Sequence, residues 1–153
     1  MEQMKEIIYK RICAVIITFL FLKGDVLADP SHQKQMLVQV KTEGGLCVKS
    51  GRECVSNVMI YNDGSCEITD ESGSHLKKSI NASDLKELVQ LIEETNFKKI
   101  KSKPFVGTCP RAYDGSEIIY TVNYDGKNEV ISTCTYQTED MKPLAIKLHE
   151  LTN

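Results

Sequence analysis

Two Asp-Gly dipeptides constrain the fold of this chain more than any other feature, because each lies between runs of strand-forming residues. Asp63-Gly64 follows a β-branched and aromatic run that ends at Tyr61. Asp125-Gly126 lies between the similar runs at residues 117–124 and 129–136. Asp-Gly supplies the positive backbone φ values that a tight turn requires. The sequence therefore predicts two antiparallel hairpins.

Three further patterns complete the fold prediction. Residues 36–42 alternate apolar and polar side chains and predict a first strand. Asn81 or Ser83 can cap a helix whose apolar residues recur at helical spacing: Leu85, Leu88, Val89 and Ile92. Pro143 suits the first turn of a last helix. This order predicts an α+β domain, in which an antiparallel sheet of about five strands has two helices packed on one face.

The N-terminus predicts export. Lys5, Lys10 and Arg11 precede an uncharged, mostly apolar run at residues 12–22, and Val26-Leu27-Ala28 suits a signal peptidase. The run is well short of the roughly 20 residues that span a bilayer. We therefore expect residues 1–28 to be a signal peptide and residues 29–153 to form a single domain. The protein is expected to be secreted or periplasmic, with no stable membrane anchor after cleavage.

Charge and residue types exclude several classes of function. The formal net charge of −2 gives no basic field for a nucleic-acid partner. The one dense basic run is typical of a solvated edge: Lys98, Lys99, Lys101 and Lys103. No serine lies in a Gly-x-Ser-x-Gly motif, and the three histidines lack metal-ligand spacing. We expect no enzymatic activity, no cofactor and no metal site.

The cysteines predict a disulfide-stabilised domain. Five remain after the signal peptide, and exported cysteines are usually oxidised. The preferred pairs are Cys109–Cys134 and Cys47–Cys54, which leave Cys66 unpaired. Spacing alone does not fix connectivity, so Cys54–Cys66 is an alternative pair.

The long connection between the first helix and the second hairpin is the most informative stretch for function. It contains Pro104, Gly107, Cys109-Pro110 and Gly115. Connections of this length in a compact domain are uncommon and are usually functional or disordered. Its cysteine and two aromatic residues argue for order, so we expect a function there.

Two resemblances suggest what this function is. Cys109-Pro110-Arg111-Ala112-Tyr113-Asp114, followed by Cys134, resembles the reactive-site region of the bacterial subtilisin-inhibitor family. That resemblance implies that Arg111 enters the primary pocket of a trypsin-like serine protease, and that Tyr113 and Asp114 brace the loop. The protein-binding residues it implies are Pro110, Arg111, Ala112 and Tyr113.

The second resemblance covers nearly the whole chain after residue 28. A strand ending in Gly44-Gly45, the Leu85–Ile92 helix, Asn96-Phe97, Tyr120-x-Val122 and Pro143-Leu144 occur in an order similar to the emfourin family. These are small inhibitors of thermolysin-like metalloproteases. The Gly-Thr-Cys-Pro and Tyr-Asp-Gly segments are also similar to those of uncharacterised exported proteins.

A purely architectural explanation of the loop is also available. Cys109 can tether it, Pro110 and Gly115 can shape it, and Tyr113 can fill the core. Arg111 and Ala112 are then left without a structural role. We therefore predict a secreted, small protein-binding domain that inhibits an extracellular or periplasmic protease through the Cys109–Gly115 loop. The alternative is a structural or binding module of the periplasm or extracellular space with no inhibitory activity.

Overall fold

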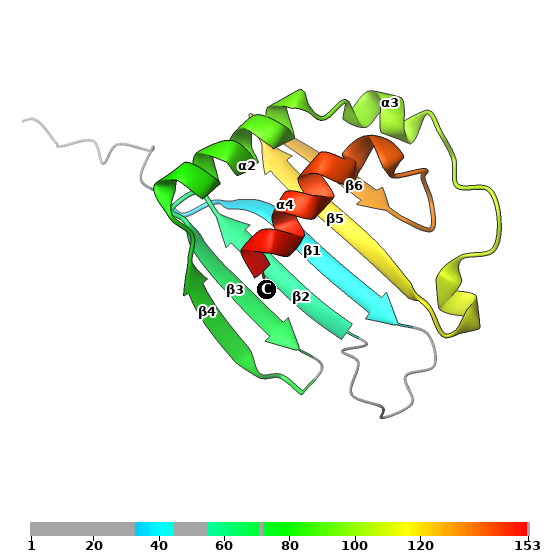
Figure 1. The fold of residues 1–153 in the computed structure, drawn as a ribbon, viewed down its shortest axis with the longest axis horizontal. Coiled ribbons are helices and arrows are strands. Elements are labelled where there is room, and N and C mark those ends of the chain that lie inside the picture. The colour runs from blue at the N-terminus through cyan, green and yellow to red at the C-terminus, as the bar shows by residue number, and fades with distance from the viewer. Residues whose placement is uncertain (1–32, 45–54, 71, 153) are drawn as a thin grey trace, which may run out of the picture. The chain divides into compact units, whose positions relative to one another are not determined.

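The computed structural model describes residues 33–44, 55–70 and 72–152, and Lys34–Asn153 is one compact unit. The strands are β1 Met36–Gly44, β2 Val55–Tyr61, β3 Ser65–Asp70, β4 His75–Ser79, β5 Ser116–Tyr124 and β6 Lys127–Ser132. The helices are α2 Ala82–Glu94, α3 Phe97–Lys101 and α4 Lys142–Thr152 (Figure 1). Two short 3-10 turns are η2 Pro110–Tyr113 and η3 Glu139–Met141. The prediction of an α+β domain is confirmed.

All neighbouring strands are antiparallel, and the sheet order is β4-β3-β2-β1-β5-β6. The two predicted hairpins are β2–β3 and β5–β6. Gly64 turns the first at φ +80°, and Asp125-Gly126 turns the second at +50° and +69°. A Cβ at position 64 would lie only 2.9 Å from the Ile80 carbonyl oxygen. Both this close contact and the positive φ require glycine at this position.

The prediction of about five strands is wrong by one, because the sheet of the described residues has six. The extra strand is β4, from a stretch with no apolar alternation. It lies at the sheet edge, where polar side chains on both faces keep contact with water. The turn before it is built locally, since the Asp70 carboxylate accepts hydrogen bonds from the Ser72 amide, the Ser72 hydroxyl and the Ser74 amide.

One hydrophobic core joins the sheet and the helices. Val38, Ile60, Val122 and Ile131 of the strands belong to the same buried cluster as the helical and turn residues Leu88, Ile92, Ile100, Met141, Leu144 and Leu148. Figure 1 shows α2 and α4 lying across the sheet. Asn81 caps α2, because its side chain accepts a hydrogen bond from the Asp84 amide at 2.9 Å. The capping interpretation of Asn81 is therefore confirmed.

A buried lysine connects the two long helices. Lys147 of α4 is only 7% exposed, and its ammonium lies 2.8 Å from the Asp84 carboxylate and 2.5 Å from that of Glu87 on α2. Hydrogen bonds to Asp84 and then Glu87 raise the pKa of Lys147. No sequence pattern indicated this contact, because the two carboxylates lie about 60 positions away in the chain.

Two predictions concern residues outside the described ranges: the signal peptide at residues 1–28 and the Cys47–Cys54 bridge. Within residues 33–44, 55–70 and 72–152, no helix has the length and apolar character needed to cross a membrane.

Candidate functional site

The connection from α3 to β5, residues 103–115, is a fixed structure that we call the anchored loop. Its first residues run beside the chain that follows β6. The Phe105 amide donates to the Thr135 carbonyl at 2.9 Å, and the Gln137 amide donates to the Lys103 carbonyl at 2.9 Å. Pro104 pairs with Tyr136 between these bonds. The loop therefore begins as a segment paired with residues 135–137 in an isolated antiparallel bridge, and not as free chain.

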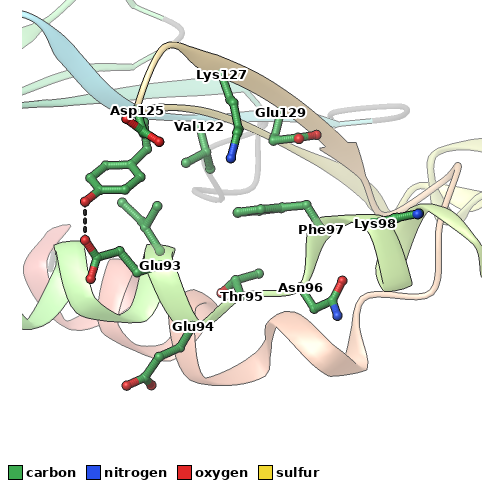
Figure 2. Close-up of a pocket in the computed structure, with 12 residues that line it drawn as sticks. Glu93, Glu94, Thr95, Asn96, Phe97, Lys98, Val122, Asp125, Lys127 and Glu129 are labelled. Carbon is green, nitrogen blue, oxygen red and sulfur yellow. Dashed lines mark hydrogen bonds between the residues drawn. The ribbon is translucent and has the colours of Figure 1, made fainter.

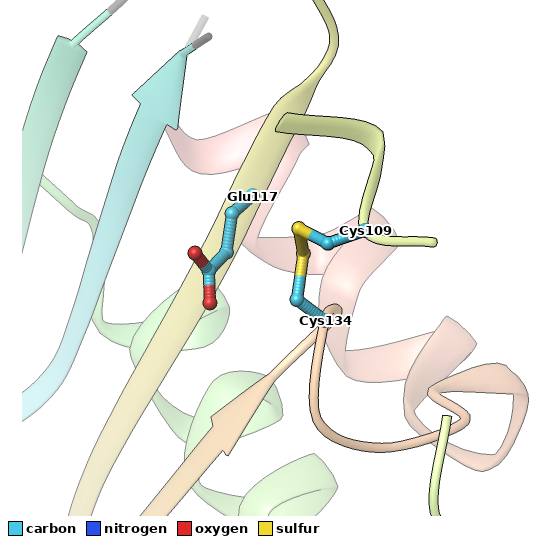
Figure 3. Close-up of side chains that lie close together, drawn as sticks. All are labelled: Cys109, Glu117 and Cys134. Carbon is cyan, nitrogen blue, oxygen red and sulfur yellow. A yellow bond between two sulfur atoms is a disulfide. The ribbon is translucent and has the colours of Figure 1, made fainter. Parts of the chain in front are cut away.

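A disulfide holds the middle of the anchored loop. Cys109 and Cys134 are bonded with a Cα–Cα distance of 5.0 Å (Figure 3), which confirms this predicted pair. Cys66 is a free thiol buried in the core, so the alternative Cys54–Cys66 bridge is not formed. Burial raises the pKa of the Cys66 thiol, which keeps it protonated and unreactive.

The last part of the anchored loop is the 3-10 turn η2. The Ala112 amide donates to the Cys109 carbonyl at 2.9 Å, and the Gly115 amide donates to the Pro110 carbonyl at 2.9 Å. Asp114 closes the turn in the left-handed region at φ +59°. A Cβ at position 115 would lie 2.7 Å from the Pro110 side chain, so glycine is required for close packing.

Arg111 braces the anchored loop against the sheet. Its guanidinium lies 2.6 Å from the Glu43 carboxylate on β1 and 3.4 Å from the Glu117 carboxylate on β5. The other oxygen of Glu117 accepts a hydrogen bond from the Ser132 hydroxyl at 2.6 Å. Lys41 and, to a lesser extent, Arg111 hold the pKa of Glu43 below its usual value. The expectation that Arg111 has no structural role is therefore wrong.

The exposed side chains of the anchored loop are mainly apolar. Val106 is 81% exposed and Tyr113 is 74% exposed, and Pro110 and Ala112 also lie at the surface. The expectation that Tyr113 fills the core is wrong, because η2 turns its side chain outward. Val106 was not predicted as a site residue. The only clue in the sequence was that Val106 is an apolar residue next to a glycine. In the structure this glycine, Gly107, has a φ of +133°.

One cluster has the residue types of a metal site. The ligand atoms of Cys109, Glu117 and Cys134 lie within 4.8 Å of one another, and no other such group of three occurs among the described residues (Figure 3). Metals bind thiolates, whereas these two sulfur atoms are bonded to each other. Both oxygens of Glu117 also have protein partners. The cluster in this oxidised form therefore serves as a structural junction.

The basic run after α2 is mostly neutralised. Lys99 and Lys103 both pair with Asp140, at 3.0 and 2.7 Å, and Lys101 pairs with Glu129 at 2.6 Å. These pairs connect α3 and the start of the anchored loop to η3 and β6. The run therefore supports the loop's attachment and does not form a positive surface for an anionic partner.

A polar groove of about 500 Å³ lies between the end of α2 and the β5–β6 turn (Figure 2). Phe97 and Val122 form its apolar part, and its charged residues have both signs, including Glu94 and Lys127. The Tyr124 hydroxyl donates to Glu93 across one end. The described lining residues include no serine, cysteine or histidine.

No protein-family model matches this sequence, and no curated protein matches it. The resemblances to the emfourin and subtilisin-inhibitor families therefore stay predictions. The anchored loop, with Val106 and Tyr113 at its surface, is the candidate functional site.

Proposed function

We propose that this chain is an exported protein-binding domain that inhibits a protease through the anchored loop. The observation that carries the proposal is the exposure of Val106 and Tyr113 on a loop that backbone hydrogen bonds, a disulfide and an ion pair all hold in place. Isolated exposed apolar residues are ordinary, but two on one fixed loop are typical of a binding surface.

Preorganisation is the physical advantage of such a loop. A partner that binds a mobile segment must order it, and each ordered side chain costs roughly 0.5–1.5 kcal/mol. Here the backbone of residues 103–105 and 110–115 is already hydrogen-bonded. Tyr113 is suited to act as an anchor, because aromatic residues contribute disproportionately to the energy of protein interfaces.

The conformation of η2 indicates how the loop would meet a protease. A protease cleft that pairs with an extended peptide does not fit residues 110–113 as they are folded, because they form a 3-10 turn. Arg111 would enter a pocket only after losing its contacts with Glu43 and Glu117. We therefore propose that Val106 and Tyr113 make the main contacts and that Arg111 holds the loop in shape.

An inhibition panel tests this proposal. The purified protein is assayed against trypsin-, subtilisin- and thermolysin-like enzymes, beside the variants Tyr113→Ser, Val106→Ser and Arg111→Ala. We expect Tyr113→Ser to weaken inhibition at least tenfold. The matched control is Ile146→Ser, which removes an exposed apolar side chain from α4 and should leave inhibition unchanged.

Two results would contradict the proposal. If Arg111→Ala alone abolishes inhibition while Tyr113→Ser does not, then Arg111 is the residue that enters the protease pocket. If none of the enzymes is inhibited at micromolar protein, the chain is instead a structural or binding module without inhibitory activity.

The proposal also includes export and the helix arrangement predicted from the sequence. We take α2 and α4 to pack together on one face of the sheet, and residues 1–28 to be removed after export to the periplasm or the medium. Mass spectrometry of the protein recovered from its host checks the second point. An N-terminus at Asp29 is expected, and an intact Met1 would rule out cleavage.

A further inference from the structure

A second groove, of about 350 Å³, lies on the helix side of the sheet beside the end of α4. Val40, Val58, Ile68 and Ile118 line it from the strands, and Ala145 and Leu148 line it from the helix. In Figure 1 the C-terminal end of α4 lies over β1 and β2. The volume lies within the range of small-molecule sites, which is roughly 300–1,000 Å³.

The strand register explains the apolar floor of this groove. Val40 is paired with Val58, Val58 with Ile68, and Ile68 with Leu76, so four apolar side chains form one row from β1 to β4. The outermost of them, Leu76, is 51% exposed. A sheet row of this length normally lies under a helix, but α4 covers only part of it. The remaining apolar surface is open to a ligand.

A tyrosine that is mostly buried also lines the groove. Tyr120, paired with Val40 across β1 and β5, is only 7% exposed. Among the described residues its hydroxyl has no hydrogen-bond partner, and no polar side-chain atom of these residues is both fully buried and unpaired. This hydroxyl therefore reaches the groove, where it is available to a ligand. Burial raises the pKa of Tyr120, so the hydroxyl keeps its proton and can donate.

The rest of the lining has no carboxylate, and it includes His149 and Thr152, whose carbonyl accepts a hydrogen bond from the Lys78 ammonium at 3.1 Å. Thr42 and Ser56, which face each other across β1 and β2, place two more hydroxyls at the groove's outer side. No lysine, arginine, aspartate or glutamate is among the described lining residues. A cationic ligand group would lose its water there without gaining an opposite charge, which is costly. A neutral hydroxyl or ester oxygen would instead find donors.

We infer that this groove binds an amphiphile whose polar group is an oxygen and not a cation: an aliphatic chain that lies along the Val40–Ile68 row and carries one hydrogen-bonding oxygen at Tyr120. Since one water occupies about 30 Å³ of liquid, the groove holds on the order of ten non-hydrogen atoms. This site is on the helix side of the sheet and involves none of the residues of the anchored loop.

A titration of the purified protein with 1-octanol, followed by NMR of the side-chain methyl groups, tests the inference. Octanol should shift the methyl signals of Ile68 and Ile118 in a saturable manner. The signals of Ile119 and Val130, whose side chains alternate to the other face of the sheet, should not move. Octylammonium, with the same chain length and a positive charge, should bind at least tenfold more weakly.

Two variants connect the signal to the groove. Ala145→Phe fills it and should abolish the shifts, whereas Ile146→Phe, at the next position of α4 and already exposed, should not. Tyr120→Phe keeps the ring and removes the hydroxyl, so binding of octanol should weaken about three- to tenfold. If Ala145→Phe does not fold, the octanol affinity of Tyr120→Phe relative to the wild type decides the question.

Three outcomes would overturn the inference. Equal binding of octanol and octylammonium would show that the lining does not select the polar group of the ligand. Unchanged affinity in Tyr120→Phe would remove the role of the hydroxyl. Concentration-dependent dimerisation of the wild type, abolished by Ile68→Lys, would show that a second copy of the chain covers the row instead.

Discussion

The disulfide between Cys109 and Cys134 is expected to contribute a large share of the stability of the domain, and replacing both cysteines by serine measures that share. The bridge connects residues 25 positions apart. Without it, the unfolded chain gains the freedom of an open loop of this length. The double variant should fold to the same sheet, because the hydrogen bonds of Phe105 and Gln137 beside the bridge do not depend on it.

The expected loss follows from the length of the closed loop. For 25 residues, the chain-entropy model gives about 3.5 kcal/mol at room temperature. A domain of this size loses about 2 kcal/mol of stability per molar urea, so the urea midpoint should fall by nearly 2 M. Because the chain contains no tryptophan, unfolding is followed by far-UV circular dichroism.

Two controls make the result interpretable. The slope of the transition should not change, since the surface exposed on unfolding is nearly the same in both proteins. Added reductant should lower the midpoint of the wild type by more than that of the double variant. A loss below about 1 kcal/mol would refute the argument, because the bridge would then restrict the unfolded chain far less than its span requires.

Three further predictions concern other parts of the fold. Gly115→Ala should destabilise the domain by about 1–3 kcal/mol in urea unfolding, because its Cβ would lie 2.7 Å from Pro110. Met141→Ala should cost about 2–5 kcal/mol, since Met141 is completely buried in the core. Lys147 lowers the pKa of Asp84, so this pair stabilises the fold above the usual aspartate pKa of 3.8 and the contribution is lost as the pH falls through the lower folded value. The urea midpoint of Lys147→Met should therefore change less than that of the wild type between pH 5 and pH 2; an identical acid dependence would contradict the assignment.

Local patterns predicted the hairpins well, because the turn chemistry of Asp63-Gly64 and Asp125-Gly126 acts within four residues. Local patterns also predicted the apolar face of α2, because its helical spacing repeats within a few residues. They placed the end of the last strand too late, since Thr135 and Tyr136 turn back to donate hydrogen bonds to the Ser132 carbonyl. They also missed β4, whose pairing depends on the neighbouring strand and not on a pattern of its own.

The candidate site was harder to predict, because its determining contacts join distant parts of the chain. The partner of Arg111 on β1 lies 68 positions away, and no periodicity relates the two residues. The outward direction of Tyr113 follows from its position at the end of the short 3-10 turn η2. A sequence pattern identified the anchored loop as important, but it could not show which side chains hold the loop and which face solvent.

The contacts of Arg111 and the exposure of Val106 and Tyr113 change the hypothesis of which residues bind a partner. A side chain already paired with two carboxylates has less to gain from a partner, because binding must first break these contacts. Breaking a half-exposed ion pair costs up to about 1 kcal/mol. Val106 and Tyr113 lose only water on contact, and burying them is favourable by roughly 25 cal/mol per Å² of apolar surface. The energy available for binding therefore lies with the two exposed apolar residues, and the charge of Arg111 serves to keep them in position.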